Sequence, residues 1–126
     1  MTITTNSNII QPINNNGLVK AMLEVGSDNT FGISRCYNGI ANSSSGNCGF
    51  VLTQPGPNAG VVRINFGFPI ASRFVAITVK YATGVQGASN GGANYRVFDA
   101  TSIEVFTFDS GNSADTTAHS FTIIMY

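Results

Sequence analysis

The sequence predicts an all-β domain, an antiparallel β-sandwich of about six to eight strands. Short apolar runs alternate with clusters of Gly, Asn, Ser and Asp at a steady spacing, which is typical of a sandwich or barrel. No segment shows a sustained apolar period of 3.6 residues, so we expect no long helix. The 126 residues fit a single domain that is long enough to bury a core.

The chain divides into an arm and a head. Residues 1–17 are rich in Asn and Thr and end in Asn-Asn-Asn-Gly, so we interpret them as a flexible N-terminal arm or the remnant of a linker. Residues 18–126 form the β-sandwich head domain. The start of the chain lacks the basic and apolar regions of a signal peptide. No apolar run reaches the roughly 18 residues of a membrane span, so we expect no membrane insertion.

Eight runs are expected to form strands. The first two, 18–25 and 30–40, flank a Gly-Ser-Asp-Asn turn and form a hairpin. The third run, 49–54, ends before Pro55-Gly56-Pro57, because proline cannot donate to a β-ladder. The other five runs are 60–68, 73–81, 94–99, 102–109 and 119–126.

The last two strands are apolar on both faces. Alternation in 102–108 puts Ile103 and Val105 on one face and Glu104, Phe106 and Phe108 on the other. In 120–126 it separates Phe121, Ile123 and Met125 from Thr122, Ile124 and Tyr126. A strand that is apolar on both faces is either central in the sandwich or part of a subunit contact.

Charged residues are scarce. They make up 10% of the chain, against about 25% in an ordinary domain, and six basic side chains balance six acidic ones. The chain therefore lacks the charge pattern of a nucleic-acid binder. So few charges protect the surface poorly against association. Either copies of the chain cover much of the surface, or neutral polar loops form the surface of an extracellular or virion protein.

Four segments occur in a characteristic order: VKAMLEV (19–25), GISRCYNGI (32–40), GVVRINFGFPIASRFVAITV (60–79) and TSIEVFTFDSGNSADTTAHSFTIIMY (101–126). Together they resemble the C-terminal domain of bacteriophage tail-fibre proteins and of related particles. Met22 stands where that family has an aromatic residue, and residues 41–59 are longer than the family's short turn. The positions that match are Lys20-Ala21, Ile33 to Asn38, Gly60 to Phe66, Phe74 to Val79, Ser102 to Val105 and Phe121 to Ile124.

The resemblance implies a compact antiparallel β domain, usually a homotrimer, that attaches a virion tail fibre or an extracellular particle to a cell surface. H-type lectins and, more distantly, the heads of bacterial collagen-like adhesins are similar in architecture. We expect the trimer contact to use the second faces of the last strands, because exposing these side chains would create a large apolar patch. The contact residues are Phe106, Phe108, Ile124 and Tyr126.

The leading interpretation is a non-enzymatic head that binds a cell-surface glycan or a similar receptor. The alternative is a purely structural domain that trimerises and caps a fibre without a ligand. Sugar sites combine an aromatic face with Asn, Asp or Arg on loops. Loops 84–96 and 109–118 follow strands of the same direction and emerge at one end. They offer Asn90, Asn94, Tyr95, Arg96, Asn112 and Asp115.

Catalytic and metal motifs are missing from the sequence. No Gly-x-Ser-x-Gly elbow occurs, and the only histidine, His119, has no evident acid and nucleophile partner. The turn between Asp109 and Asp115 lacks the Gly and Glu placement of an EF-hand. We therefore expect neither an enzyme nor a cofactor or metal.

The two cysteines, Cys36 and Cys48, bracket a run of Asn, Ser and Gly. A structural zinc site needs four ligands, and the spacing is not that of a redox motif. The remaining alternatives are a disulfide or two reduced thiols. With the run as a long hairpin loop, the two residues approach within about 6 Å. We favour the disulfide, because an exposed protein meets oxidising conditions after assembly in a reducing cytoplasm.

Overall fold

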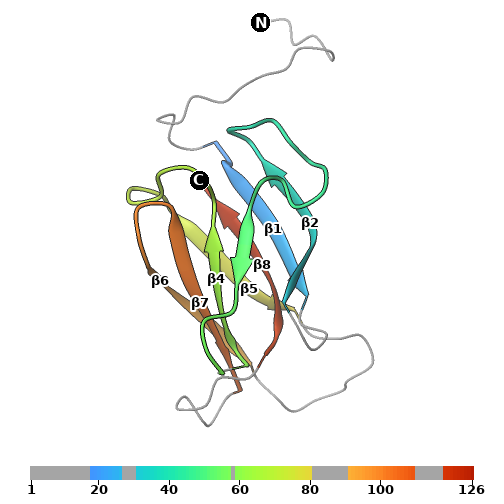
Figure 1. The fold of residues 1–126 in the computed structure, drawn as a ribbon, viewed down its shortest axis with the longest axis vertical. Coiled ribbons are helices and arrows are strands. Elements are labelled where there is room, and N and C mark those ends of the chain that lie inside the picture. Colours follow the sequence, from blue (N-terminus) through green and yellow to red (C-terminus); the bar gives the residue numbers. More distant parts are fainter. Residues whose placement is uncertain (1–17, 27–30, 58, 81–90, 110–117) are drawn as a thin grey trace, which may run out of the picture.

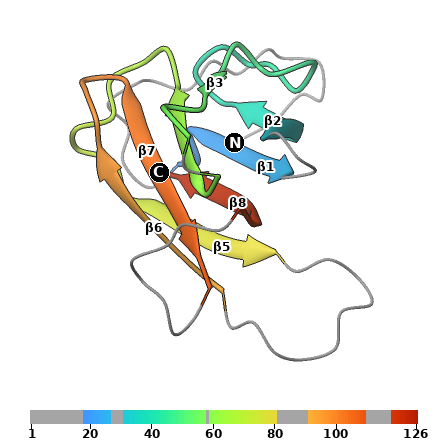
Figure 2. The ribbon, with the colours of Figure 1, turned by 60° about the horizontal axis from the view of Figure 1, so that its bottom comes forward.

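A computed structural model describes residues 18–26, 31–57, 59–80, 91–109 and 118–126. These residues form a sandwich of two four-stranded antiparallel sheets (Figure 1), which confirms the predicted fold class. Figure 2 shows β6 and β7 on one side of the sandwich and β1 and β2 on the other. Within the described ranges, no helix has the length and apolar composition that crossing a membrane requires.

Each expected run overlaps one strand. Sheet A has the order β2 (Gly32–Asn38), β1 (Ala21–Gly26), β8 (Ser120–Met125), β5 (Val75–Lys80). Sheet B has the order β3 (Val51–Thr53), β4 (Val61–Asn65), β7 (Ser102–Phe108), β6 (Gly92–Val97). Strand β6 begins two residues earlier than predicted. It ends at Val97 because the N–H of Phe98 turns to donate to the carbonyl of Ser102, at 2.9 Å.

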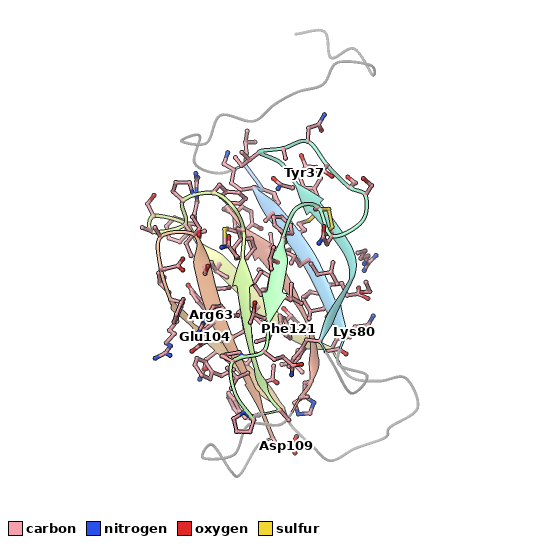
Figure 3. All side chains as sticks on the ribbon, viewed as in Figure 1. Tyr37, Arg63, Lys80, Glu104, Asp109 and Phe121 are labelled. Atoms are coloured by element: carbon pink, nitrogen blue, oxygen red, sulfur yellow. A yellow bond between two sulfur atoms is a disulfide. The ribbon has the colours of Figure 1, made fainter. Side chains whose placement is uncertain are left out.

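The core lies between the two sheets. Side chains alternate along each strand, so the inward positions of β1, β4, β7 and β8 are apolar and buried. Phe121 of β8 is fully buried, and its ring centroid lies 6.0 Å from that of Phe31 (Figure 3). Burying one such side chain stabilises the fold by about 1.5–3 kcal/mol. The other buried inward residues of these strands are Ala21, Leu23, Val25, Val62, Ile64, Ile103, Val105, Ile123 and Met125.

Both strands with two apolar faces are central in their sheets. Strand β8 pairs with β1 and β5, and β7 pairs with β4 and β6. Backbone groups of both strands are therefore bonded on both sides. Their second faces are the outer faces of the sandwich.

Several strand ends meet at one end of the sandwich. Strands β1 and β5 both end where β8 begins, and Gly92 at the start of β6 pairs with Phe108 at the end of β7. A Cβ atom on Gly91 would lie 3.0 Å from Nε2 of His119, so the two sheets adjoin there. The residues that flank 81–90 and those that flank 110–117 therefore share one end, as the strand directions predict.

The chain from β2 to β3 crosses between the sheets, so the expectation of a long hairpin loop is wrong. Strand β2 is an edge strand of sheet A, and β3 is an edge strand of sheet B. The crossing is favoured because Cys48 and Phe50, before β3, are buried in the core between the sheets. Residues 42–47 stay outside that core and are mostly exposed.

A disulfide and a buried amide hold this crossing connection. Cys36 of β2 and Cys48 form a disulfide with a Cα–Cα distance of 6.1 Å. Beside it, Asn38 donates from Nδ2 to the Cys48 carbonyl at 3.0 Å. Its Oδ1 accepts from the N–H groups of Ile40 and Ala41, at 3.1 and 3.0 Å. Asn38 therefore satisfies buried polar groups that would otherwise be costly.

Replacing both cysteines by serine should lower the free energy of unfolding by about 3 kcal/mol, because a bridge across 12 positions restricts the unfolded chain. Urea unfolding without reductant measures the loss. Adding reductant to the unmodified protein should give a similar loss and leave the double variant unchanged. Equal stability of the two proteins without reductant would contradict the entropic role of the bridge.

Phe121→Ala should lower the free energy of unfolding by about 3–5 kcal/mol, because it removes a fully buried ring and leaves a cavity. Phe74→Ala is the matched control, since Phe74 is 77% exposed and its truncation should change stability by about 0.5 kcal/mol or less. Urea unfolding of both variants checks the assignment of core and surface.

Candidate functional site

Each sheet turns one face outward, and these two faces carry the side chains available for recognition. We call the outward side of sheet A face A and that of sheet B face B. Because neighbouring strands are antiparallel and in register, residues paired across strands lie side by side on the same face. Figure 3 shows Arg63 and Glu104 on one side of the sandwich and Lys80 and Tyr37 on the other.

Face B carries a charged row across β4, β7 and β6. Glu104 lies directly opposite Arg63 on one side and Arg96 on the other. Oε2 of Glu104 accepts from Nη2 of Arg63 at 2.9 Å, and Oε1 accepts from Nε and Nη2 of Arg96 at 3.0 and 2.6 Å. Aromatic rings border the row. The guanidinium of Arg63 lies 3.4 Å from the ring centroid of Phe98, and that of Arg96 lies 5.7 Å from Phe106.

Face A carries a similar row centred on Glu24. Oε2 accepts from Nη2 of Arg35 at 2.8 Å, and Oε1 accepts from Nζ of Lys80 at 2.9 Å. The register between β1 and β2 shifts between Glu24 and Val25, which adds one residue to β2. The hydroxyl of Ser34 therefore also reaches Oε1 of Glu24, at 3.2 Å.

Both carboxyls favour their charged forms. The hydrogen bond from Lys80 lowers the pKa of Glu24, and Arg35 lowers it further. Burial alone raises the pKa of Glu104, but the hydrogen bonds from Arg63 and Arg96 outweigh burial and hold this pKa below its usual range. At neutral pH each carboxylate therefore fixes two cations in place.

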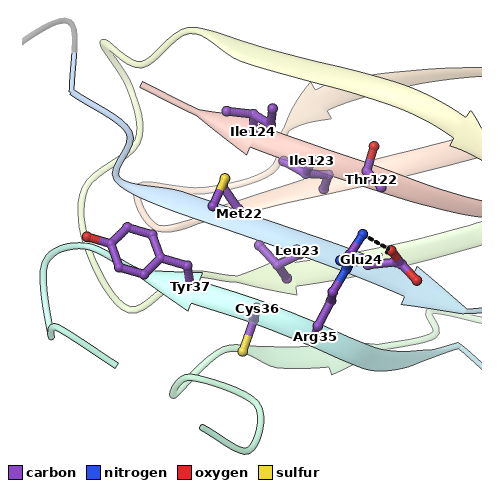
Figure 4. A pocket seen from close by; sticks show the side chains of 9 residues that line it. All are labelled: Met22, Leu23, Glu24, Arg35, Cys36, Tyr37, Thr122, Ile123 and Ile124. Atoms are coloured by element: carbon purple, nitrogen blue, oxygen red, sulfur yellow. Dashed lines mark hydrogen bonds and ion pairs between the residues drawn. The ribbon is translucent and has the colours of Figure 1, made fainter. Parts of the chain in front are cut away.

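A shallow depression of about 370 Å³ lies on face A above β2, β1 and β8 (Figure 4). Tyr37 and Met22 line one end, and Glu24, Arg35 and Thr122 line the other. Ile124 of β8 lies directly opposite Met22, at the Tyr37 end. Leu23, Cys36 and Ile123 complete the lining.

The part of face A around this depression is unusually apolar. Tyr37, Met22, Ile124 and Ala76 lie directly opposite one another and form an apolar row across all four strands. Met22 is 41% exposed. Two residues beyond Ala76 and Ile124, at the same end, lie Phe74 and Tyr126, which are 77% and 37% exposed. The backbone N–H of Tyr126 donates to the carbonyl of Phe74 at 2.9 Å.

The predicted ligand residues do not form one site in the described part of the chain. Asn90, Asn112 and Asp115 lie outside the described residues. Asn94, Tyr95 and Arg96 lie in strand β6, not in a loop as predicted, because this segment pairs fully with β7. Asn94 and Arg96 face outward on face B. Tyr95 lies opposite the core residue Val105 and faces the other side, where the sheet edge leaves it 40% exposed.

The four residues expected at a trimer contact also separate. Phe106 and Phe108 of β7 lie on face B, and Ile124 and Tyr126 lie on face A. The expectation of a single patch is therefore corrected, because β7 and β8 belong to different sheets. A contact that used all four would join two different surfaces of each subunit.

His119 has an acid partner that the sequence does not reveal. Its Nε2 lies 2.7 Å from Oδ1 of Asp109, and its backbone N–H donates to the hydroxyl of Thr107 at 3.2 Å. The pair joins the two flanks of residues 110–117. In the described part of the chain, no three His, Cys, Asp or Glu side chains lie close enough to hold a metal ion.

Sequence reasoning missed the residues of the depression. Alternation in 18–25 and 30–40 already separates Met22 and Glu24 from the core positions, and the same holds for Arg35 and Tyr37. What it does not show is that β8, about 100 positions along the chain, lies beside β1. The depression depends on that pairing.

Glu104→Gln should lower the free energy of unfolding at pH 7 by about 1–3 kcal/mol, because it weakens the hydrogen bonds of two arginines. The folded pKa of Glu104 is depressed, so its contribution is complete above the unfolded value of about 4.3 and is lost as pH falls through the folded value. Thermal unfolding between pH 7 and pH 2 should therefore show a smaller acid-induced loss in the variant. An unchanged pH profile would show that the row contributes nothing to stability.

Comparison of the chain with family models, with curated proteins and with solved structures finds no match. The site is therefore defined by its own geometry: two outward faces, each with a carboxylate between two cations, and the depression on face A.

Proposed function

We propose that the domain is a non-enzymatic attachment head that binds a cell-surface glycan in the depression on face A. One observation carries the proposal, the combination of an aromatic ring with hydrogen-bonding groups around a concave surface. Ligand sites are concave and mostly apolar, with a few polar groups that fix orientation. The depression of about 370 Å³ is of the size that such sites have.

The lining suits a sugar ring. The C–H face of a sugar packs against an aromatic or apolar surface, which Tyr37, Met22 and Ile124 provide. Its hydroxyls need donors and acceptors, which Arg35 and Thr122 provide, while Glu24 accepts hydrogen bonds from Arg35, Ser34 and Lys80 and holds Arg35 in place. The ion pair between Arg35 and Glu24 holds both groups at fixed positions, at a distance of 2.8 Å. A site organised before binding loses less conformational entropy when the ligand arrives.

The resemblance to tail-fibre heads supports the same proposal, because those domains attach particles to cell surfaces. In this proposal the chain is part of a virion tail fibre or of another extracellular particle. A single shallow site binds weakly, so several copies on one particle raise the overall strength of attachment.

Tyr37→Ala should weaken glycan binding about tenfold or more, since it removes the aromatic wall of the depression. Binding is measured on an array of cell-surface oligosaccharides, with circular dichroism as the check of folding. Tyr95→Ala is the matched variant, because Tyr95 is 40% exposed and lies on β6 of the other sheet. If only Tyr95→Ala lost binding, the glycan site would lie at β6, as predicted from sequence. If the unmodified protein bound no glycan, the proposal would be contradicted.

A second candidate function is structural, a domain that associates with copies of itself as a homotrimer and caps a fibre. The specific observation in its favour is the apolar row on face A with Phe74 and Tyr126 beside it. Removing large exposed apolar side chains of this kind from water is favourable, and such patches mark contacts between proteins. The same patch borders the depression, so association through it would compete with a ligand.

Light scattering decides between the two uses of face A. One chain has a mass of 13.2 kDa, so a trimer would show about three times that value. Ile124→Asp should return a trimer to the monomer mass by placing a charge in the apolar row. Phe108→Asp on face B should leave the mass unchanged. A monomer mass for the unmodified protein at micromolar concentration would remove this candidate, and dissociation by Phe108→Asp alone would move the contact to face B.

A further inference from the structure

Face B holds two arginines that one buried carboxylate fixes side by side. Arg63 and Arg96 flank Glu104 on neighbouring strands, at 2.9 and 2.6 Å from its two oxygens. The side chain of Glu104 is only 4% exposed. The row carries a net charge of +1, because one carboxylate faces two guanidinium groups.

Glu104 orients the arginines and has little capacity for an incoming ligand. Both of its oxygens already accept hydrogen bonds, three in total from the two guanidinium groups. Arg96 uses Nε and Nη2 for Glu104, and its side chain is still 63% exposed. The outward N–H groups of Arg96 therefore face solvent, held in one direction by the carboxylate behind them.

Aromatic rings fix the two arginines further. The guanidinium of Arg63 stacks on Phe98 at 3.4 Å from the ring centroid, and Arg96 lies 5.7 Å from Phe106. Phe98 remains 43% exposed, which leaves apolar ring surface beside the charged row. Asn94 lies directly opposite Phe106 and adds an exposed amide.

As far as the structure describes the chain, the row on face A lacks two of these features, a second arginine and a stacked aromatic ring. Glu24 also binds two cations, but one of them is Lys80, whose ammonium is a point charge without the planar fork of arginine. In the described residues, no ring stacks on Arg35 or Lys80 as Phe98 does on Arg63. Only face B therefore combines two oriented forks with exposed aromatic surface.

We propose that Arg63 and Arg96 on face B form a binding site for the oxyanion of an acidic saccharide, with Phe98 packing against its sugar ring. A guanidinium fork matches the paired oxygens of a carboxylate or a phosphate. An anion neutralises the excess positive charge of the row. This site lies on the opposite side of the sandwich from the depression and does not depend on the proposed function.

Titration with three sugars tests the site: D-glucuronate, D-glucose 6-phosphate and D-glucose. Calorimetry gives the dissociation constants, and the ¹⁵N–¹H resonance of Arg96 Nε reports contact at the row. At least one of the two acidic sugars should bind about tenfold more tightly than glucose and shift that resonance. Binding of glucuronate alone assigns the site to carboxylates, and binding of the phosphate alone assigns it to phosphates. Equal affinity for all three, or no binding at millimolar concentration, overturns the proposal.

Arg96→Lys keeps the charge and removes the fork, so it separates recognition from simple attraction. The acidic sugar should bind about tenfold more weakly to this variant while the melting temperature stays close to that of the unmodified protein. Arg73→Lys is the matched control, because Arg73 lies in the connection between β4 and β5, outside the row. An equal loss in both variants, or no loss in Arg96→Lys, overturns the assignment to face B.

Discussion

The rest of the structure depends on the burial of one face of each sheet against the other. A strand alternates its side chains strictly, so once Phe121, Ile123 and Met125 turn inward, the remaining residues of β8 must turn outward. The same constraint acts on β1, β4 and β7. It places Glu24 and Glu104, the only glutamates of the chain, on the outer faces. A slip of one residue in β1, β4 or β7 would bury a charge and expose the core.

The few charges of this chain are concentrated on those outer faces. Both glutamates and four of the six Lys and Arg residues belong to the two rows, Arg35 and Lys80 with Glu24, and Arg63 and Arg96 with Glu104. Each row pairs one carboxylate with two cations and therefore keeps a net charge of +1. Six of the chain's twelve charged side chains form these two rows, which give each outer face a polar strip.

The sequence predicts the strands well because each strand is a local pattern. Each of the eight runs overlaps one strand, and β6 ends at Val97, earlier than predicted, because of the turn at Phe98. The crossing of the chain between sheets after Asn38 was not predictable, because burial of Cys48 and Phe50 depends on the partner sheet. The depression was missed for the same reason. Tyr37 and Thr122 come to line the same depression only through the order of strands in sheet A, which no local pattern encodes.

The position of the charged rows has a consequence for assembly. The two outer faces point in nearly opposite directions, and subunits that stacked face A on face B would extend into an open polymer. Such stacking would remove water from Glu24, Glu104 and their cations, which costs more than the contacts return. The charged rows therefore disfavour polymerisation by stacking of face A on face B. The apolar row through Met22 and Ile124 lies on face A, so an association that used this row alone would pair surfaces of one kind and would not extend into an open polymer.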